Sequence, residues 1–319
     1  DAEGGNKEIF CAGMRNPYGI AFNTDGEAFT YDADAEFDMG TPWYRHTQVK
    51  HLTSGADFGW RAVTGSWPSY FPDHPDNTQA TLDIGKGSPT GVKFGTKSNF
   101  PPDYQKALYI LDWTYGRILA VHLRPRGSTY MGEAEVFLRG QPLNVTDLGF
   151  GPDGAMYFVT GGRKTKSALY RVSYTGPSTQ PRPLTKAQSN RDKRAKNFRA
   201  ERKNAESYHR QAKFAFKGKH TEPRIRNAWR IALEHNQLTP KKEDTPNFEN
   251  LTAHDNINSA TGKAKVTLMD NWSELLPSEK LAYLDLIRRN MERHELPSKT
   301  LAAIQSNLEP HFPNSSTEI

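Results

Sequence analysis

The spacing of hydrophobic positions changes about halfway along the chain. Up to about residue 175, short runs of aromatic and β-branched residues alternate with turns rich in Gly, Pro, Asn and Asp, which is typical of β-strands. Residues 176–185 are rich in Pro, Ser and Thr, and beyond them apolar residues recur at helical spacing. We therefore expect a β domain over residues 1–175, a linker over 176–185 and a helical region over 186–319.

Three segments of the β region share one pattern. Residues 17–22 recur as residues 89–94 and, more loosely, as residues 146–151, and each copy is followed by a second strand-like run that ends in a polar residue. Repeats of this size with inserted loops are typical of the blades of a β-propeller, and a β-sandwich with similar turns is the alternative. Three blades cannot close a ring, so we expect further blades before residue 1.

The second half of the chain contains runs that fit helices, at residues 187–216, 224–235, 278–294 and 298–308. The first run is polar and basic, whereas the third has one apolar and one charged face. Residues 240–263 are polar and rich in turn formers. Paired short helices suggest HEAT-like repeats, so the sequence predicts a mainly β region followed by α-helical, HEAT-like repeats.

The composition narrows the classes of function. The chain has 319 residues and a single cysteine, which excludes an intrachain disulfide and a CxxC metal or haem site. No run of about 18 apolar residues, the length of a membrane-spanning helix, occurs. The first residues carry neither an initiator Met nor a signal segment, and both ends resemble cuts through a longer polypeptide.

The net charge of +6 is concentrated in one segment. Residues 186–219 hold twelve Lys and Arg against three acidic residues, and the rest of the chain is close to neutral. Because this segment has few aromatic residues, we interpret it as a solvated helix face and expect no nucleic-acid partner.

Arg15 and Asn16 form the first candidate site. An Arg supplies a planar fork for carboxylates, an Asn supplies both donors and an acceptor, and Pro17 restricts Asn16 to an extended conformation. Both side chains would then be presented where a strand begins. They could bind an anionic or oxygen-rich ligand. Alternatively, Arg15 could have a purely structural role within the blade.

An acidic cluster follows the first repeat. Asp32, Asp34 and Glu36 are carboxylates at alternate positions, which could gather around one calcium ion if the loop curls. The glycine and glutamate spacing of an EF-hand is missing, so that motif is excluded. A solvated acidic loop is the alternative.

The loop at residues 40–46 is aromatic and basic. It could line a sugar or quinone pocket, or it could pack on the β domain. His46, His51 and His122 show no metal-ligand spacing, and we expect each to be structural or exposed.

The ordered motifs of the β region carry a family resemblance. They are residues 15–19, 32–45, 55–60, 87–91, 111–116, 151–157 and 160–163. In these motifs the chain resembles the glucose/sorbosone dehydrogenase group of quinoprotein β-propellers. More closely, it resembles the planctomycete and verrucomicrobial proteins described as membrane-bound dehydrogenases, in which a propeller precedes helical repeats and a c-type haem domain. The resemblance covers residues 1–175 well and the helical remainder loosely.

The resemblance implies that residues 1–175 are the C-terminal blades of a six-bladed propeller. Arg15 and Asn16 would contact the quinone cofactor PQQ, and the segment with Asp32, Asp34 and Glu36 would hold calcium beside it. The protein would oxidise a sugar or related alcohol. Electrons would pass to a c-type haem domain outside this chain but in the same full-length polypeptide, in an extracytoplasmic location.

Three departures from the family pattern bear on this prediction. The catalytic base of the family lies in an earlier blade, so no catalytic residue is assigned in this chain. The calcium-binding Gly-Pro carbonyl pair is replaced by Asp32 and Ala33. Arginines expected near the quinone are replaced by residues such as Asn144 and Thr146. A non-catalytic propeller that binds carbohydrate or a protein is therefore the alternative, and a lactonase-type hydrolase is a weaker one.

Overall fold

The computed structural model describes residues 3–5, 7–42, 44–60, 77–211, 222–236, 266, 268–269, 272–275 and 277–311. The chain forms two compact units. The first, here called the β unit, comprises Asp1–Pro72 and Asn77–Arg199, and the second, the helical unit, comprises Asp73–Asp76 and Ala200–Ile319. The division at Arg199 lies inside a helix, while the segment expected to be a linker, 176–185, contains neither helix nor strand.

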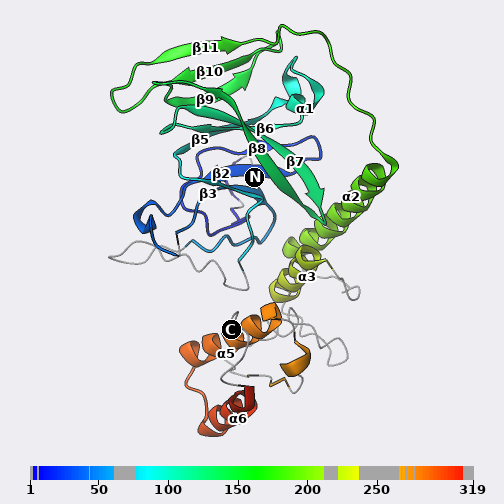
Figure 1. Ribbon diagram of the computed structural model, residues 1–319. Coiled ribbons are helices and arrows are strands. Elements are labelled where there is room, and N and C mark those ends of the chain that lie inside the picture. Colours follow the sequence, from blue (N-terminus) through cyan, green and yellow to red (C-terminus); the bar gives the residue numbers. More distant parts are fainter. Residues whose placement is uncertain are drawn as a thin grey trace. The chain divides into compact units, whose positions relative to one another are not determined.

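Three antiparallel sheets make up the β unit (Figure 1). The first has the order β1 (Ala21–Phe22), β2 (Ala28–Asp32), β3 (Thr47–Leu52), β4 (Leu82–Gly85). The second has the order β5 (Pro89–Phe94), β6 (Leu108–Asp112), β7 (Arg117–Arg126), β8 (Thr129–Arg139), with the short helix α1 (Pro102–Gln105) between β5 and β6. The third has the order β11 (Ala168–Val172), β10 (Met156–Thr160), β9 (Val145–Phe150).

The structure confirms that the β region is built from antiparallel sheets. The predicted repeat corresponds to the strand pairs β1–β2, β5–β6 and β9–β10, whose second strands end at Asp32, Asp112 and Thr160. The leading strands β1 and β9 both lie against β5. Such neighbouring inner strands are typical of propeller blades, and closure into a six-bladed ring remains a prediction.

The hydrophobic core lies between successive sheets. One cluster joins Phe29 and Tyr31 of β2 to the second sheet, and another joins Tyr109 of β6 to Met156 and Phe158 of the third sheet. β2 and β6 are buried along their whole length because both of their faces are covered. Each fully buried large side chain contributes roughly 1.5–3 kcal/mol to the free energy of unfolding, so these clusters fix the strand register.

Helix α2 (Lys186–Ser207) begins at a capping box. The Thr185 hydroxyl accepts a hydrogen bond from the Gln188 backbone N–H, and the Gln188 side chain accepts one from the Thr185 N–H. Further along, the Arg199 guanidinium donates to Asp25 Oδ2 at 2.9 Å and lies 5.0 Å from the centre of the Tyr130 ring. The part of α2 up to Arg199 is therefore anchored on the β unit.

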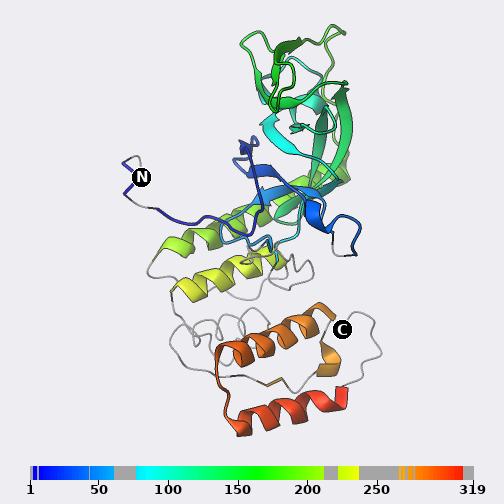
Figure 2. The ribbon, with the colours of Figure 1, turned by 90° about the vertical axis from the view of Figure 1, so that its left-hand side faces the viewer.

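The predicted helices of the helical unit are confirmed as α3 (Pro223–His235), α5 (Pro277–Arg293) and α6 (Ser298–Leu308). The Glu222 carboxylate caps α3 by accepting from the Ile225 N–H. α5 and α6 lie side by side and share an apolar cluster that includes Tyr283, Ile287 and Ile304 (Figure 2). HEAT-like repetition remains a prediction, and residues 240–263 lie outside the described residues.

The prediction of one helix over 187–216 is wrong in its last part. α2 ends at Ser207, a 3-10 turn follows over Tyr208–Arg210, and Gln211 is extended. The Tyr208 ring stacks on Trp229 at 5.5 Å, and the His209 ring bonds to the Ala228 carbonyl at 2.8 Å. These contacts turn the chain toward α3, which a continuous helix would not allow. Among the described helices, none is long and apolar enough to cross a membrane.

Candidate functional site

The buried carboxylate of Asp32 fixes the loop that carries Arg15 and Asn16. Its Oδ2 accepts the Arg15 backbone N–H at 3.0 Å, and its Oδ1 accepts the Asn16 N–H at 2.8 Å. The Lys50 ammonium on β3 completes the arrangement at 2.5 Å from Oδ2. Neither partner of this ion pair is accessible to solvent, since the side chains are 1% and 0% exposed. Asp32 therefore holds the strand entrance in place.

The second sheet repeats this device at Asp112. The Asp112 carboxylate accepts the backbone N–H of Ser88 at 2.9 Å and the Arg117 Nε–H at 2.8 Å. Ser88, like Asn16, precedes the proline of the repeat. A carboxylate paired with a cation at the same place in two sheets indicates a structural role, because a buried carboxylate must find hydrogen-bond partners in each sheet.

The side chains of Arg15 and Asn16 lie in different environments. Arg15 Nη2 donates to Glu36 Oε1 at 2.7 Å, and its side chain is mostly buried, whereas that of Glu36 is half exposed. Asn16 is exposed at the start of the repeat. The two residues lie beside the end of β2 at Asp32, a place here called the rim, where Asn16 is exposed and the Arg15 charge is opposed by Glu36.

Asp34 is held by a tyrosine from the aromatic loop. The Tyr44 hydroxyl donates to Asp34 Oδ2 at 2.6 Å. Burial raises the pKa of the Asp34 carboxyl, although this hydrogen bond opposes the shift. Burial together with the neighbouring carboxylate raises the pKa of the Tyr44 hydroxyl, which stays protonated and can keep donating.

The structure does not bring Asp32, Asp34 and Glu36 together as metal ligands. Each carboxylate has a partner from the protein: Lys50 for Asp32, Tyr44 for Asp34 and Arg15 for Glu36. Within the parts of the chain that are described, no group of three or more His, Cys, Asp or Glu is placed to hold a metal ion. Calcium, which takes six to eight oxygen ligands, does not fit this donor set.

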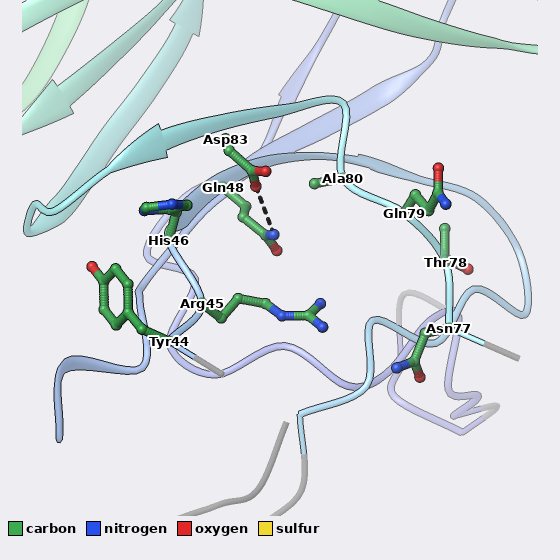
Figure 3. A pocket seen from close by; sticks show the side chains of 9 residues that line it. All are labelled: Tyr44, Arg45, His46, Gln48, Asn77, Thr78, Gln79, Ala80 and Asp83. Carbon is green, nitrogen blue, oxygen red and sulfur yellow. Dashed lines mark hydrogen bonds between the residues drawn. The ribbon is translucent and has the colours of Figure 1, made fainter. Parts of the chain in front are cut away.

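A polar pocket adjoins the acidic loop (Figure 3). Its volume is about 340 Å³, and it is lined by Tyr44, Arg45, His46, Gln48, Asn77, Thr78, Gln79, Ala80 and Asp83. Gln48 on β3 and Asp83 on β4 are register partners, and the Gln48 amide donates to the Asp83 carboxylate at 2.8 Å. Tyr44 connects the two regions, because it lines the pocket and also bonds to Asp34.

The sequence left open whether the loop at residues 40–46 lines a sugar or quinone pocket or packs on the β domain. Three of its residues, Tyr44, Arg45 and His46, line the polar pocket, and the kind of ligand stays a prediction. Trp43 lies outside the described residues. The lining residues from Asn77 to Asp83 were missed, because no motif marks them. The one sequence signal was their run of amide and hydroxyl side chains before a short strand.

The other histidines occupy structural positions, as expected. The His51 ring is buried, stacks on Phe29 and bonds to Glu27 and Thr129, each at 2.9 Å. The His122 ring bonds to Glu135 at 2.9 Å on the exposed side of β7. Neither histidine is among the residues that line the polar pocket.

Asn144 and Thr146 stand where the family resemblance implies basic residues. The Asn144 amide donates to the Trp113 carbonyl at 3.0 Å, and the Thr146 hydroxyl donates to the Val159 carbonyl at 3.2 Å. Both side chains tie backbone segments together, so these two positions provide no positive charge for an anionic ligand.

No family model and no curated protein matches the chain. A putative oxidoreductase (glucose dehydrogenase) from Thermus thermophilus is 22% identical, with a TM-score of 0.39, over 52% of this chain and 49% of that one. The PQQ-bound aldose sugar dehydrogenase from Streptomyces coelicolor is 12% identical, with a TM-score of 0.37, over 51% and 44%.

A further solved structure, described as a glucose dehydrogenase, is 19% identical to this chain with a TM-score of 0.42. The match covers 54% of this chain and 49% of that one. The chain thus spans about half the length of the solved structures it matches. Because these TM-scores are all below about 0.5, the functional argument rests on the chain's own residues.

Proposed function

We propose that the β unit is part of a quinoprotein-type oxidoreductase that oxidises a sugar or related alcohol. Electrons would pass to a c-type haem domain elsewhere in the full-length polypeptide, in an extracytoplasmic location. The ordered series of motifs supports the family. The observation that supports the site is that the Asp32 carboxylate holds the loop of Arg15 and Asn16 through two backbone N–H bonds.

The cofactor residues proposed are Arg15 and Asn16. When bound, PQQ would supply the acceptor for the hydride of the alcohol. Arg15 can bind a quinone carboxylate only if its ion pair with the half-exposed Glu36 breaks. Calcium does not fit the acidic cluster and has no role in the proposed function. The general base is not assigned in this chain, whose own contribution is to position ligands at the rim.

One observation favours a second candidate, a non-catalytic propeller that binds carbohydrate. The charges near the rim are largely compensated within the protein, since Asp32 pairs with Lys50 and Glu36 with Arg15. A quinone with three carboxylates requires several cations, and Asn144 and Thr146 provide none. A neutral sugar has no such requirement.

The full-length protein, incubated with PQQ with and without calcium, tests these candidates. The oxidoreductase predicts dye reduction with sugars, a change in the quinone absorbance, and loss of both in Arg15→Ala. The exposed Arg124, which pairs with Glu133 on β7 and β8, gives a matched control, and Arg124→Ala is expected to retain activity. Sugar binding without turnover or absorbance change would establish the second candidate, and absence of all three would refute both.

A further inference from the structure

The pocket between the start of β3 and the segment before β4 is unusually polar for a small-molecule site. Eight of the nine described residues that line it carry polar side chains, and Ala80 is the exception. Pockets for drug-like ligands are lined mainly by apolar and aromatic groups, with few polar ones. The ligand that suits this lining therefore has a high density of hydrogen-bonding groups.

The lining offers donors and acceptors together. The amides of Gln48, Asn77 and Gln79 can each donate and accept, as can the Thr78 hydroxyl. Sugar hydroxyl groups also donate and accept, so they can match such a surface without leaving polar atoms unpaired. A volume of about 340 Å³ is at the lower end of the range of roughly 300–1,000 Å³ for small-molecule sites, which suits one or two sugar rings.

The charge of the pocket favours a neutral ligand. Among the described lining residues, Arg45 carries the permanent positive charge and Asp83 the negative charge. An anionic sugar would gain from Arg45 but would face the Asp83 carboxylate. Because the two charges offset each other, ionic attraction does not select an acid or an amine.

Several of the polar groups are held in place before any ligand binds. Gln48 and Asp83 bond to each other across paired strands, and Tyr44 is fixed by Asp34. Gly59, with φ of +83°, lets the Asn77 amide lie where a Cβ atom would otherwise be. Side chains that are ordered in advance lose less entropy on binding, which raises affinity.

We propose that this pocket binds a neutral mono- or disaccharide through the amides of Gln48, Asn77 and Gln79 and the Asp83 carboxylate. The inference deepens the proposed function and rests on it for the sugar as substrate class. It places sugar recognition on β3, β4 and the segment before β4. Tyr44 links the pocket to the acidic loop, because it lines the pocket and donates to Asp34.

The test is titration calorimetry of the full chain, without PQQ, against glucose, galactose, xylose, maltose and galacturonate. We expect at least one neutral sugar to bind. Gln79→Ala should weaken that sugar about five- to tenfold, the loss of one or two hydrogen bonds. Gln180→Ala, an exposed glutamine in residues 176–185, is the matched control and should bind as the unmodified chain does.

Asp83→Asn keeps the shape of the pocket and removes its negative charge. It should weaken the neutral sugar and strengthen galacturonate, and thermal unfolding of each variant checks that it is folded. The proposal is overturned if no sugar binds, if galacturonate binds the unmodified chain more tightly than galactose, or if Gln79→Ala has no effect. Sugar binding without dye reduction would refute the proposed oxidoreductase and support this sugar site. Dye reduction together with unchanged sugar binding in Gln79→Ala and Asp83→Asn would support the oxidoreductase and refute this sugar site.

Discussion

The buried ion pair of Asp32 and Lys50 gives the sharpest quantitative prediction. Removing one partner of a buried pair typically costs about 3–5 kcal/mol, because the other charge is left without compensation. In Lys50→Met the Asp32 carboxylate would keep its bonds from the backbone N–H groups of Arg15, Asn16 and Ala33. We therefore expect a loss near the lower end, about 3 kcal/mol.

The double variant Asp32→Asn/Lys50→Met separates charge from packing. It leaves no buried charge and keeps similar volumes, so it should cost less than Lys50→Met alone, by roughly 1–2 kcal/mol. Arg124→Met, which breaks an exposed pair with Glu133, is the control and should change stability by less than about 0.5 kcal/mol.

Urea unfolding measures these differences, and hydrogen exchange of β2 and β3 peptides assigns them to the β unit. A loss below about 1 kcal/mol in Lys50→Met, or a double variant less stable than the single one, would refute the account of the pair. Calcium offers an independent check, because a ligand that binds the folded state raises its stability. If calcium stabilised the protein and Asp32→Asn abolished the effect, Asp32 would be a metal ligand rather than a structural group.

The remaining predictions concern backbone, anchoring and pH. Gly13→Ala should destabilise the β unit more than Gly26→Ala in urea unfolding. Both glycines have φ near +70°, but an added Cβ atom would clash with Asp57 at Gly13 and meets open space at Gly26. Equal losses in the two variants would contradict this prediction. Arg199→Met should speed hydrogen exchange in the part of α2 up to residue 199, whereas the exposed Lys196→Met should not. Burial raises the pKa of the Asp34 carboxyl in the folded chain above its ordinary 3.8. Between these two pKa values the folded chain binds more protons than the unfolded chain, so the free energy of unfolding falls as the pH rises through this interval. Asp34→Asn should flatten this fall in urea midpoints taken from about pH 3.5 to 6.5, and an unchanged slope would count against it.

Local patterns predicted much of the secondary structure. The strand pairs of the three repeats and the helices α3, α5 and α6 follow from the spacing of apolar residues, a property of each segment alone. The end of α2 did not follow, because it depends on Tyr208 and His209 meeting residues of α3 about twenty positions away.

The role of Arg15, Asn16 and the acidic cluster as a ligand site stays a prediction, and the structure shows which partners these residues have within the protein. The sequence placed Arg15, Asn16, Asp32, Asp34 and Glu36 near one another, and the structure does connect the two segments. A carboxylate can be satisfied by a metal, a cation or a backbone N–H, and the residue type does not say which. The choice depends on partners brought in by the fold.

The sequence by itself determined the mainly β region and the helices that follow, and it offered Arg15, Asn16 and the acidic cluster as candidates for a ligand site. These features depend on composition and on short periods along the chain. Only the tertiary structure decided that Asp32 pairs with Lys50, that Asp34 holds Tyr44, and that Gln48 and Asp83 face one pocket. The physical reason is that strand pairing and burial set which charges and hydrogen-bonding groups meet, and a buried group must find its partner there.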